Sequence, residues 1–367
     1  MTVIRRILRP SVALAAAVAL TAMLAACAPG PGPGAGPGDD SSKPGVQGPT
    51  PLVSVACADL VALDDIRAAL GEAVEPDEFP FEPGGTWPLT HVGLQQGGAL
   101  FCHWSDAANQ AGEHAASLEV IALPDATAWG AWEKVIAGWG PPSGFGDASY
   151  GTCSSSLGGS YQYCRHDVLV GGVWLYVSVQ NLTDPDAAVP IVRSVVDAMS
   201  AAEVSAATWA PAASGISLPT ECEQLLSTET VAATVATADI APREPSLNMP
   251  LIHNPALVTG PSAGLDCSWS NPYSSAVAMP VAVSVLPGAG WAWEASWARP
   301  RPDRAPAAAL AGLGDAAFSG CATDQNSCFV DVLADGAWIA VSGNNEAGLD
   351  ALAELARAAL DALGYDG

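Results

Sequence analysis

The stretch GFGDASYGTC at residues 144–153 recurs as GLGDAAFSGC at residues 312–321. A Cys-x-Trp triplet precedes each stretch, as CHW at residues 102–104 and as CSW at residues 267–269. A similar pair, GGVWLYVSV from Gly171 and DGAWIAVSG from Asp335, follows in the same order. A repeat with so long a period indicates two copies of a whole domain and not a solenoid.

Eight cysteines lie within the two copies as two sets of four. The first two of each set are 45 residues apart, and the later intervals of 51 and 11 become 54 and 7 in the second copy. In an exported chain an even number is typical of disulfides, and a shared pattern confined to each copy leaves three pairings. The last two cysteines of each set flank a short polar stretch that predicts a hairpin tip, where opposed residues share one face. The favoured pairs are Cys57 with Cys102, Cys153 with Cys164, Cys222 with Cys267, and Cys321 with Cys328.

Each copy predicts the same series of elements. A short helix is expected in LDDIRAALG from Leu63 and in STETVAATVA from Ser227, since acids and hydroxyls at the start accept the free N–H groups. Apolar runs at residues 99–104, 116–123, 264–269 and 276–286 predict strands. A helix with tryptophans, the Gly-Asp-Ala turn, three strands and a closing helix follow. This order predicts an α+β fold with two similar domains, each an antiparallel sheet with helices packed on one face and two disulfides.

The first 26 residues have the layout of a secretory signal peptide, with three arginines before an uncharged apolar run from Val12 to Ala26. At about 1.5 Å per residue the run reaches ~22 Å, which is too short to span the ~30 Å hydrocarbon core. The sequence LAAC at residues 24–27 resembles a bacterial lipobox. This resemblance implies that the Cys27 thiol carries a diacylglyceryl group and that acyl chains anchor the mature protein. The alternative is an ordinary signal peptide cut at an Ala-x-Ala-like site.

Composition then divides the chain. Residues 1–26 are the expected lipoprotein signal peptide, and residues 27–51, rich in Gly and Pro, are expected to form a disordered tether. Residues 52–204 and 219–367 are the two four-cysteine domains, and residues 205–218 are the linker between them. Removal of the signal peptide takes away three of 13 basic and none of 38 acidic residues, which leaves a net charge of −28. So acidic a surface repels nucleic acid, which we do not expect as a partner.

The spacing of the cysteines, Cys-x-Trp and Gly-Asp-Ala is similar to that of a family of actinobacterial envelope lipoproteins of unassigned function. It also resembles, more distantly, the four-cysteine extracellular sensor domains of receptor serine/threonine kinases. The resemblance covers each copy from its first cysteine to its last helix. It implies a fold and a location at the outer face of the cell membrane, and it supplies no catalytic residue. This chain differs by its two copies and by the absence of a kinase segment.

Three residue types are candidates for chemistry. Asp147 and Asp315 occupy the repeated Gly-Asp-Ala stretch, where we expect their carboxylates to close a turn and not to form a catalytic pair. His103 lies between a cysteine and a tryptophan but is Ser268 in the other copy, and we expect it on the solvent side of a strand. Tryptophans cluster at residues 129–139 and 291–297, where core packing is favoured over a ligand groove. Those in the strands, Trp104, Trp174, Trp269 and Trp338, are expected in the core.

One basic segment opposes the acidic composition. The stretch ARPRPDRAP places Arg299, Arg301 and Arg304 in one proline-rich loop. A solvated loop is the simpler interpretation, and an anion-binding site is the alternative. The histidines and cysteines show no metal-ligand spacing, and no nucleophile, phosphate-loop or cofactor motif is present. The sequence therefore predicts a lipid-anchored protein that binds an unknown envelope protein or a small ligand, without catalysis, metal or cofactor. The alternatives are an envelope-acting enzyme that uses carboxylates and a structural spacer.

Overall fold

The computed structural model describes residues 48–77, 87–106, 115–124, 133, 136–138, 140–155, 162–206, 209–210, 214–237, 239–243, 264–270, 281–297, 307–322, 327–344 and 347–366. All of these belong to one compact unit, Gly45–Gly367. The predicted signal peptide, the lipidated Cys27, most of the tether and the loop with Arg299, Arg301 and Arg304 lie outside the described residues.

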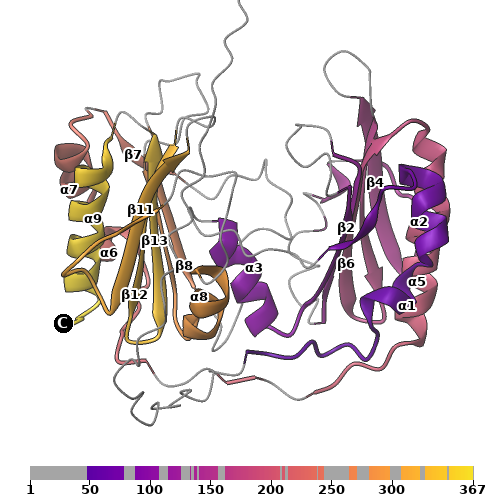
Figure 1. Cartoon of the computed structure of the whole chain (residues 1–367), viewed down its shortest axis with the longest axis horizontal. Coiled ribbons are helices and arrows are strands. Elements are labelled where there is room, and N and C mark those ends of the chain that lie inside the picture. The colour runs from indigo at the N-terminus through magenta and orange to yellow at the C-terminus, as the bar shows by residue number, and fades with distance from the viewer. Residues whose placement is uncertain are drawn as a thin grey trace, which may run out of the picture. The chain divides into compact units, whose positions relative to one another are not determined.

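Two antiparallel sheets carry the fold, one from each copy of the repeat (Figure 1). The first has the order β1-β2-β3-β6-β5-β4 and the second the order β10-β11-β12-β13-β9-β8-β7. Read in the same direction, the two sheets have the same strand order, with β7, β8, β9, β11, β12 and β13 in the places of β1 to β6. The second sheet has β10 as an additional edge strand. The first consists of β1 (Glu75–Asp77), β2 (Leu100–Ser105), β3 (Ser117–Leu123), β4 (Ala148–Ser155), β5 (Gln162–Val170) and β6 (Val173–Leu182). The second consists of β7 (Ala241–Arg243), β8 (Leu265–Ser270), β9 (Val281–Leu286), β10 (Ala308–Ala309), β11 (Ala316–Ala322), β12 (Ser327–Ala334) and β13 (Ala337–Asn344).

One face of each sheet is covered by helices from the same copy. The first sheet packs against α1 (Cys57–Leu60), α2 (Leu63–Leu70) and α5 (Ala188–Ala201), as Figure 1 shows. The second packs against α6 (Cys222–Leu225), α7 (Thr228–Thr234) and α9 (Leu349–Ala362). In α9 the buried residues recur at three- and four-residue spacing, which gives one apolar stripe toward the sheet. The predicted α+β class with antiparallel sheets is confirmed.

Two further helices lie against the opposite faces of the sheets, which we call the open faces. Helix α3 (Trp87–Gln96) was not expected from the sequence, whereas α8 (Gly290–Trp297) is the predicted tryptophan-bearing helix of the second copy. A short 3-10 helix, η2 (Pro185–Ala187), precedes α5. No helix in the described part of the chain has the length and apolar character needed to cross a membrane.

The four disulfides join the cysteines that the spacing favours: Cys57–Cys102, Cys153–Cys164, Cys222–Cys267 and Cys321–Cys328. The first of each copy ties the N-terminal end of a short helix, α1 or α6, to the second strand of the sheet. The second joins directly opposed residues of a hairpin, β4–β5 or β11–β12. Each hairpin therefore has one register, because a shift of one residue would turn the two cysteines to different faces.

The Gly-Asp-Ala stretch closes the same turn in both copies. The Gly171 N–H donates to Asp147 Oδ2 at 2.7 Å, and the Asp335 N–H donates to Asp315 Oδ2 at 2.7 Å. The glycine before each aspartate has a positive φ, 56° for Gly146 and 63° for Gly314. A Cβ atom on either would lie 2.4 Å from a carbonyl oxygen of the neighbouring strand. The expectation that both aspartates are turn residues is confirmed.

This turn gives the first prediction. Gly146→Ala should lower the free energy of unfolding by about 2–5 kcal/mol, since the left-handed conformation and the contact with the Leu169 carbonyl both oppose a side chain. The control is Gly171→Ala, where φ is 54° but no atom lies within 4 Å of the new Cβ. That variant should lose only about 1–2 kcal/mol in the same urea titration. Equal losses would show that the close approach is unimportant.

Candidate functional site

A row of polar side chains crosses the open face of the first sheet. Its members are consecutive cross-strand partners, from β1 through β2, β3, β6 and β5 to β4. Alternate residues of the same strands, such as Cys102, Val120 and Val177, lie in the core beneath α1, α2 and α5, so these polar side chains face the other way. We call this set the polar row: Asp77, His103, Glu119, Ser178, Arg165 and Thr152.

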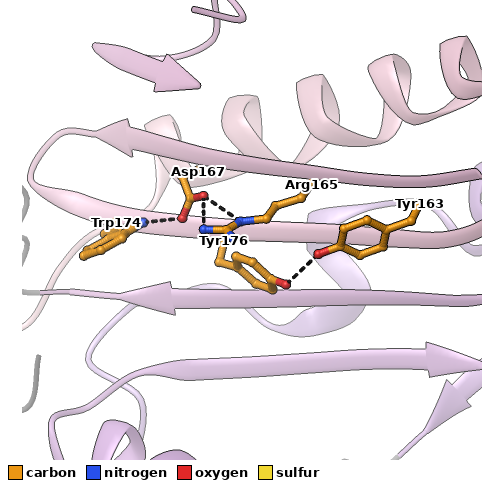
Figure 2. A network of polar contacts seen from close by, with 5 residues as sticks. All are labelled: Tyr163, Arg165, Asp167, Trp174 and Tyr176. Carbon is orange, nitrogen blue, oxygen red and sulfur yellow. Dashed lines mark hydrogen bonds and ion pairs between the residues drawn. The ribbon is translucent and has the colours of Figure 1, made fainter. Parts of the chain in front are cut away.

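Arg165 of the polar row is part of a buried network (Figure 2). Its Nε donates to Asp167 Oδ2 at 2.9 Å, and Trp174 Nε1 donates to Asp167 Oδ1 at 3.1 Å. The guanidinium carbon lies 5.4 Å from the centre of the Tyr176 ring, whose hydroxyl is 3.3 Å from that of Tyr163. Burial raises the pKa of Asp167, while Arg165 and Trp174 act in the opposite direction. The ion pair and the indole thus stabilise a carboxylate that is only 3% exposed.

Glu119 lies at the centre of the face and titrates far from its ordinary range. Desolvation by burial raises its pKa from 4.5 to about 7. His91 of α3 places Nε2 3.9 Å from Glu119 Oε1, and its ring meets that of Phe101 edge-on. A carboxyl with this pKa exchanges a proton near neutral pH, which an ordinary surface glutamate does not do.

His103 and Asp77 form the end of the polar row at the edge strand. His103 Nδ1 is 3.5 Å from Asp77 Oδ2, to which the Ser105 hydroxyl also donates at 3.0 Å. Burial lowers the pKa of His103, and the nearby Asp77 carboxylate offsets part of this effect. The predicted strand position of His103 is correct, but its side chain is only 18% exposed. The expected solvent-side position is therefore wrong, because Asp77 of β1 lies against it.

The second sheet has the same geometry with different side chains. The positions of His103, Glu119, Ser178 and Arg165 are occupied by Ser268, Ala282, Ser342 and Phe329. An aromatic cluster fills this open face, where Trp297 stacks on Phe318 with ring centres 4.2 Å apart. One polar contact is retained, since Trp338 Nε1 donates to Asp331 Oδ1 at 3.2 Å as Trp174 does to Asp167. The Asp–Trp hydrogen bond thus belongs to the fold, whereas His103, Glu119 and Arg165 have no ionisable counterpart in the second copy, where Arg243 takes the position of Asp77.

Other candidates from the sequence lie elsewhere. Asp147 and Asp315 each close their own turn and form no carboxylate pair. His166 lies on the helix-covered face of the first sheet, where burial lowers its pKa to about 4. Of the tryptophans predicted to be core, Trp104, Trp174, Trp269, Trp338 and Trp293 are buried. Trp129, Trp132, Trp139, His114 and His253 lie outside the described residues.

The open face of the first sheet has little free volume in the described structure. A cavity of about 10 Å³ next to Arg165, Asp167 and Tyr150 has room for a single water molecule. Ile136 covers this cavity from above the sheet. The described residues contain no group of three or more His, Cys, Asp or Glu side chains that could hold a metal ion. This cavity does not have room for anything larger than water.

Comparison of the chain with protein families, with curated proteins and with solved structures finds no match. The structure itself provides the comparison that matters for the site, because the second copy has the same sheet topology without counterparts of His103, Glu119 and Arg165.

The sequence does not reveal the polar row because its members lie on six different strands and are 13 or more residues apart in the chain. His103, Glu119 and Ser178 each occur as a polar residue between apolar ones, and alternation alone places such a residue on the solvent side. A signal was present in the alignment of the two copies. Glu119 aligns with Ala282 and Arg165 aligns with Phe329. The two copies therefore differ at these strand positions, although their cysteines, Cys-x-Trp triplets and Gly-Asp-Ala stretches agree.

Glu119 gives the second prediction. Its folded-state pKa is raised, so its neutral form favours folding below about pH 4.5 and this contribution is lost as the pH rises through 7. Glu119→Gln keeps the neutral shape at every pH. It should unfold with nearly the wild-type free energy at pH 4.5 and be more stable by up to about 3 kcal/mol at pH 8.5.

Denaturant titrations at the two pH values measure this difference. The control is Glu354→Gln on the exposed side of α9, which should leave the pH dependence unchanged. If Glu119→Gln is less stable than the wild type at pH 8.5, Glu119 is a stabilising carboxylate and not a desolvated one.

Proposed function

We propose that this chain is a lipid-anchored protein of the outer face of the cell membrane that binds a small polar ligand or an envelope partner at the polar row. The observation that carries the proposal is the difference between the two copies of one fold. Groups that the fold requires occur in both copies: the disulfides, the Gly-Asp-Ala turn and the Asp–Trp hydrogen bond. Glu119, His103 and Arg165 occur in one, so the fold does not require them.

The energetics support a functional role for these groups. A carboxyl whose pKa is about 7 in place of 4.5 opposes folding by about 3 kcal/mol when it is ionised. The second copy shows that an apolar residue at this position is compatible with the same sheet. Residues that reduce stability without being needed for folding are typical of binding and catalytic sites.

The side chains of the first open face indicate the chemistry of the ligand. Asp77 and Glu119 accept hydrogen bonds, Arg165 donates them, and the hydroxyls of Ser178 and Thr152 do both. Phe101 and Tyr176 provide aromatic surface beside the polar groups. A ligand with several hydroxyl or amine groups and an apolar side satisfies this arrangement, whereas a purely apolar ligand would leave buried polar groups unpaired.

A second candidate function is catalysis on envelope material. It is favoured by one observation, the raised pKa of Glu119, since a general acid or base works best with a pKa near the operating pH. A spacer, by contrast, has no use for buried ionisable groups. Binding remains the first proposal because the polar and aromatic side chains of the first open face together support recognition of a ligand, whereas the raised pKa of Glu119 is the single observation that favours a reaction.

The location rests on the sequence and on the disulfides. Four disulfides are stable in the oxidising space beyond the membrane and uncommon in the cytosol. The lipobox-like LAAC at residues 24–27 and the similarity to actinobacterial envelope lipoproteins support anchoring through Cys27. The Gly- and Pro-rich tether would then separate the folded part from the lipid.

The third prediction concerns the ligand. Thermal unfolding is measured with a panel of neutral sugars, polyamines and dicarboxylates, and at least one should raise the melting temperature of the wild type. Glu119→Ala, which installs the residue of the second copy, should reduce the affinity for that compound at least tenfold. Arg165→Phe should act likewise, and the second copy shows that Phe is tolerated beside the Asp–Trp pair.

The matched control is Phe329→Leu at the position of the second sheet that corresponds to Arg165, which should leave the shift unchanged. Binding that survives both Glu119→Ala and Arg165→Phe would place the ligand elsewhere. Turnover of an added compound that depends on Glu119 would favour the catalytic alternative over binding.

The fourth prediction concerns the anchor. Mass spectrometry of the protein from membranes should find an N-terminal Cys27 with acyl chains, and Cys27→Ser should shift the protein from the membrane to the soluble fraction. Loss of two acyl chains removes most of the membrane affinity. A wild-type protein cut at another residue, with a free Cys27, would support the ordinary signal peptide.

A further inference from the structure

Helix α3 presents two opposite faces to two different partners. His91 and Leu94 lie three residues apart on one face, where Leu94 packs with Ile121 and Trp174 of the first sheet. On the same face His91 approaches Glu119. These contacts place α3 over the centre of the polar row.

The other face of α3 contacts the second sheet. Leu89 and Val92 pack in one cluster with Leu286, Trp293 and Trp338. Gln96 adds a hydrogen bond, from Nε2 to the backbone oxygen of Pro287 at 3.1 Å. Leu89, Val92 and Gln96 recur at three- and four-residue spacing, which places them on one side of the helix.

A buried position between two surfaces explains the composition of α3. The apolar residues Leu89, Val92 and Leu94 occur on both faces, so the helix lacks the single apolar stripe of α5 or α9. Val92 and Leu94 are both fully buried. A helix of ten residues is about 15 Å long and moves as one body, so it cannot leave one surface and keep all its contacts with the other.

From this geometry we propose that α3 is a common cover for the open faces of both sheets, so that its displacement from Glu119 also uncovers the apolar patch around Trp293 and Trp338. The polar row and the aromatic face of the second sheet are then opened together. A compound that binds the polar row by displacing α3 exposes an apolar surface on the other copy. The inference rests on the contacts of α3 and holds whether or not the polar row binds a ligand.

The fifth prediction tests this cover from the side away from the polar row. Val92→Asp places a charge in the cluster with Leu286 and Trp293 and should displace α3. Glu119, which faces the His91 side of α3 and not the Val92 side, should then become solvated. Its pKa should fall from about 7 toward 4.5, as followed by ¹³C NMR titration of the glutamate carboxyls and assigned with Glu119→Gln.

The control is Val189→Asp, the same change at an exposed position of α5, which should leave the Glu119 titration unchanged. In the Val92→Asp protein the methyl signals of Leu286 report on the second sheet. If these signals shift while Glu119 keeps its wild-type pKa, the two faces open independently and the proposal is wrong. If Val92→Asp fails to fold, Val92→Ala replaces it, and its deleted methyl groups should shift signals of Ile121 as well as of Leu286.

Discussion

The register of the two cysteine hairpins is the constraint on which the rest of the structure depends. In β4–β5 and β11–β12 the bonded cysteines are direct partners, so each hairpin has one alignment of its strands. Side chains alternate between faces with a period of two, and a slip by one residue would turn Arg165 into the apolar core and Cys164 out of it. The row from Asp77 to Thr152 exists only because six strands keep this alignment at once. The disulfides therefore determine the position of the ionisable groups as well as the stability of the sheets.

With the same strand register, the two copies bury different side chains on their open faces. The first sheet buries ionisable groups and neutralises part of their charge through the Arg165–Asp167 pair, while Glu119 responds by a raised pKa. The second sheet fills the same face with Phe329, Trp297 and Trp293. This face also keeps two carboxyls, the buried Asp331 and the half-buried Asp266, and burial raises the pKa of Asp266, but the position of Glu119 itself is filled by Ala282. The first copy keeps ionisable side chains at positions where the second copy does without them, and this is the reason to look for a function there.

Much of this fold could be predicted from the sequence, for physical reasons that can be named. Cysteine spacing and the turn residues Gly146 and Gly314 are local constraints, and the duplication showed each of them twice. The long strands and α9 carry clear periodicity. In contrast, β1, β7 and β10 are two or three residues long, too short for an alternation signal. Helix α3 was missed because it is apolar on both sides, so it has no amphipathic period to detect.

The candidate site could not be predicted from the sequence because the register of the strands brings its side chains together. Taken alone, His103 has the pattern of a solvent-facing strand residue, although its neighbours in space are Asp77 and Glu119, which are 26 and 16 residues away in the chain. No single segment contains enough of the polar row to stand out from ordinary strand alternation. The pattern becomes visible when the two copies are compared position by position, since a fold requirement should appear in both. By that criterion the Asp–Trp hydrogen bond is structural, and the ionisable groups around Glu119 are what remains to be explained.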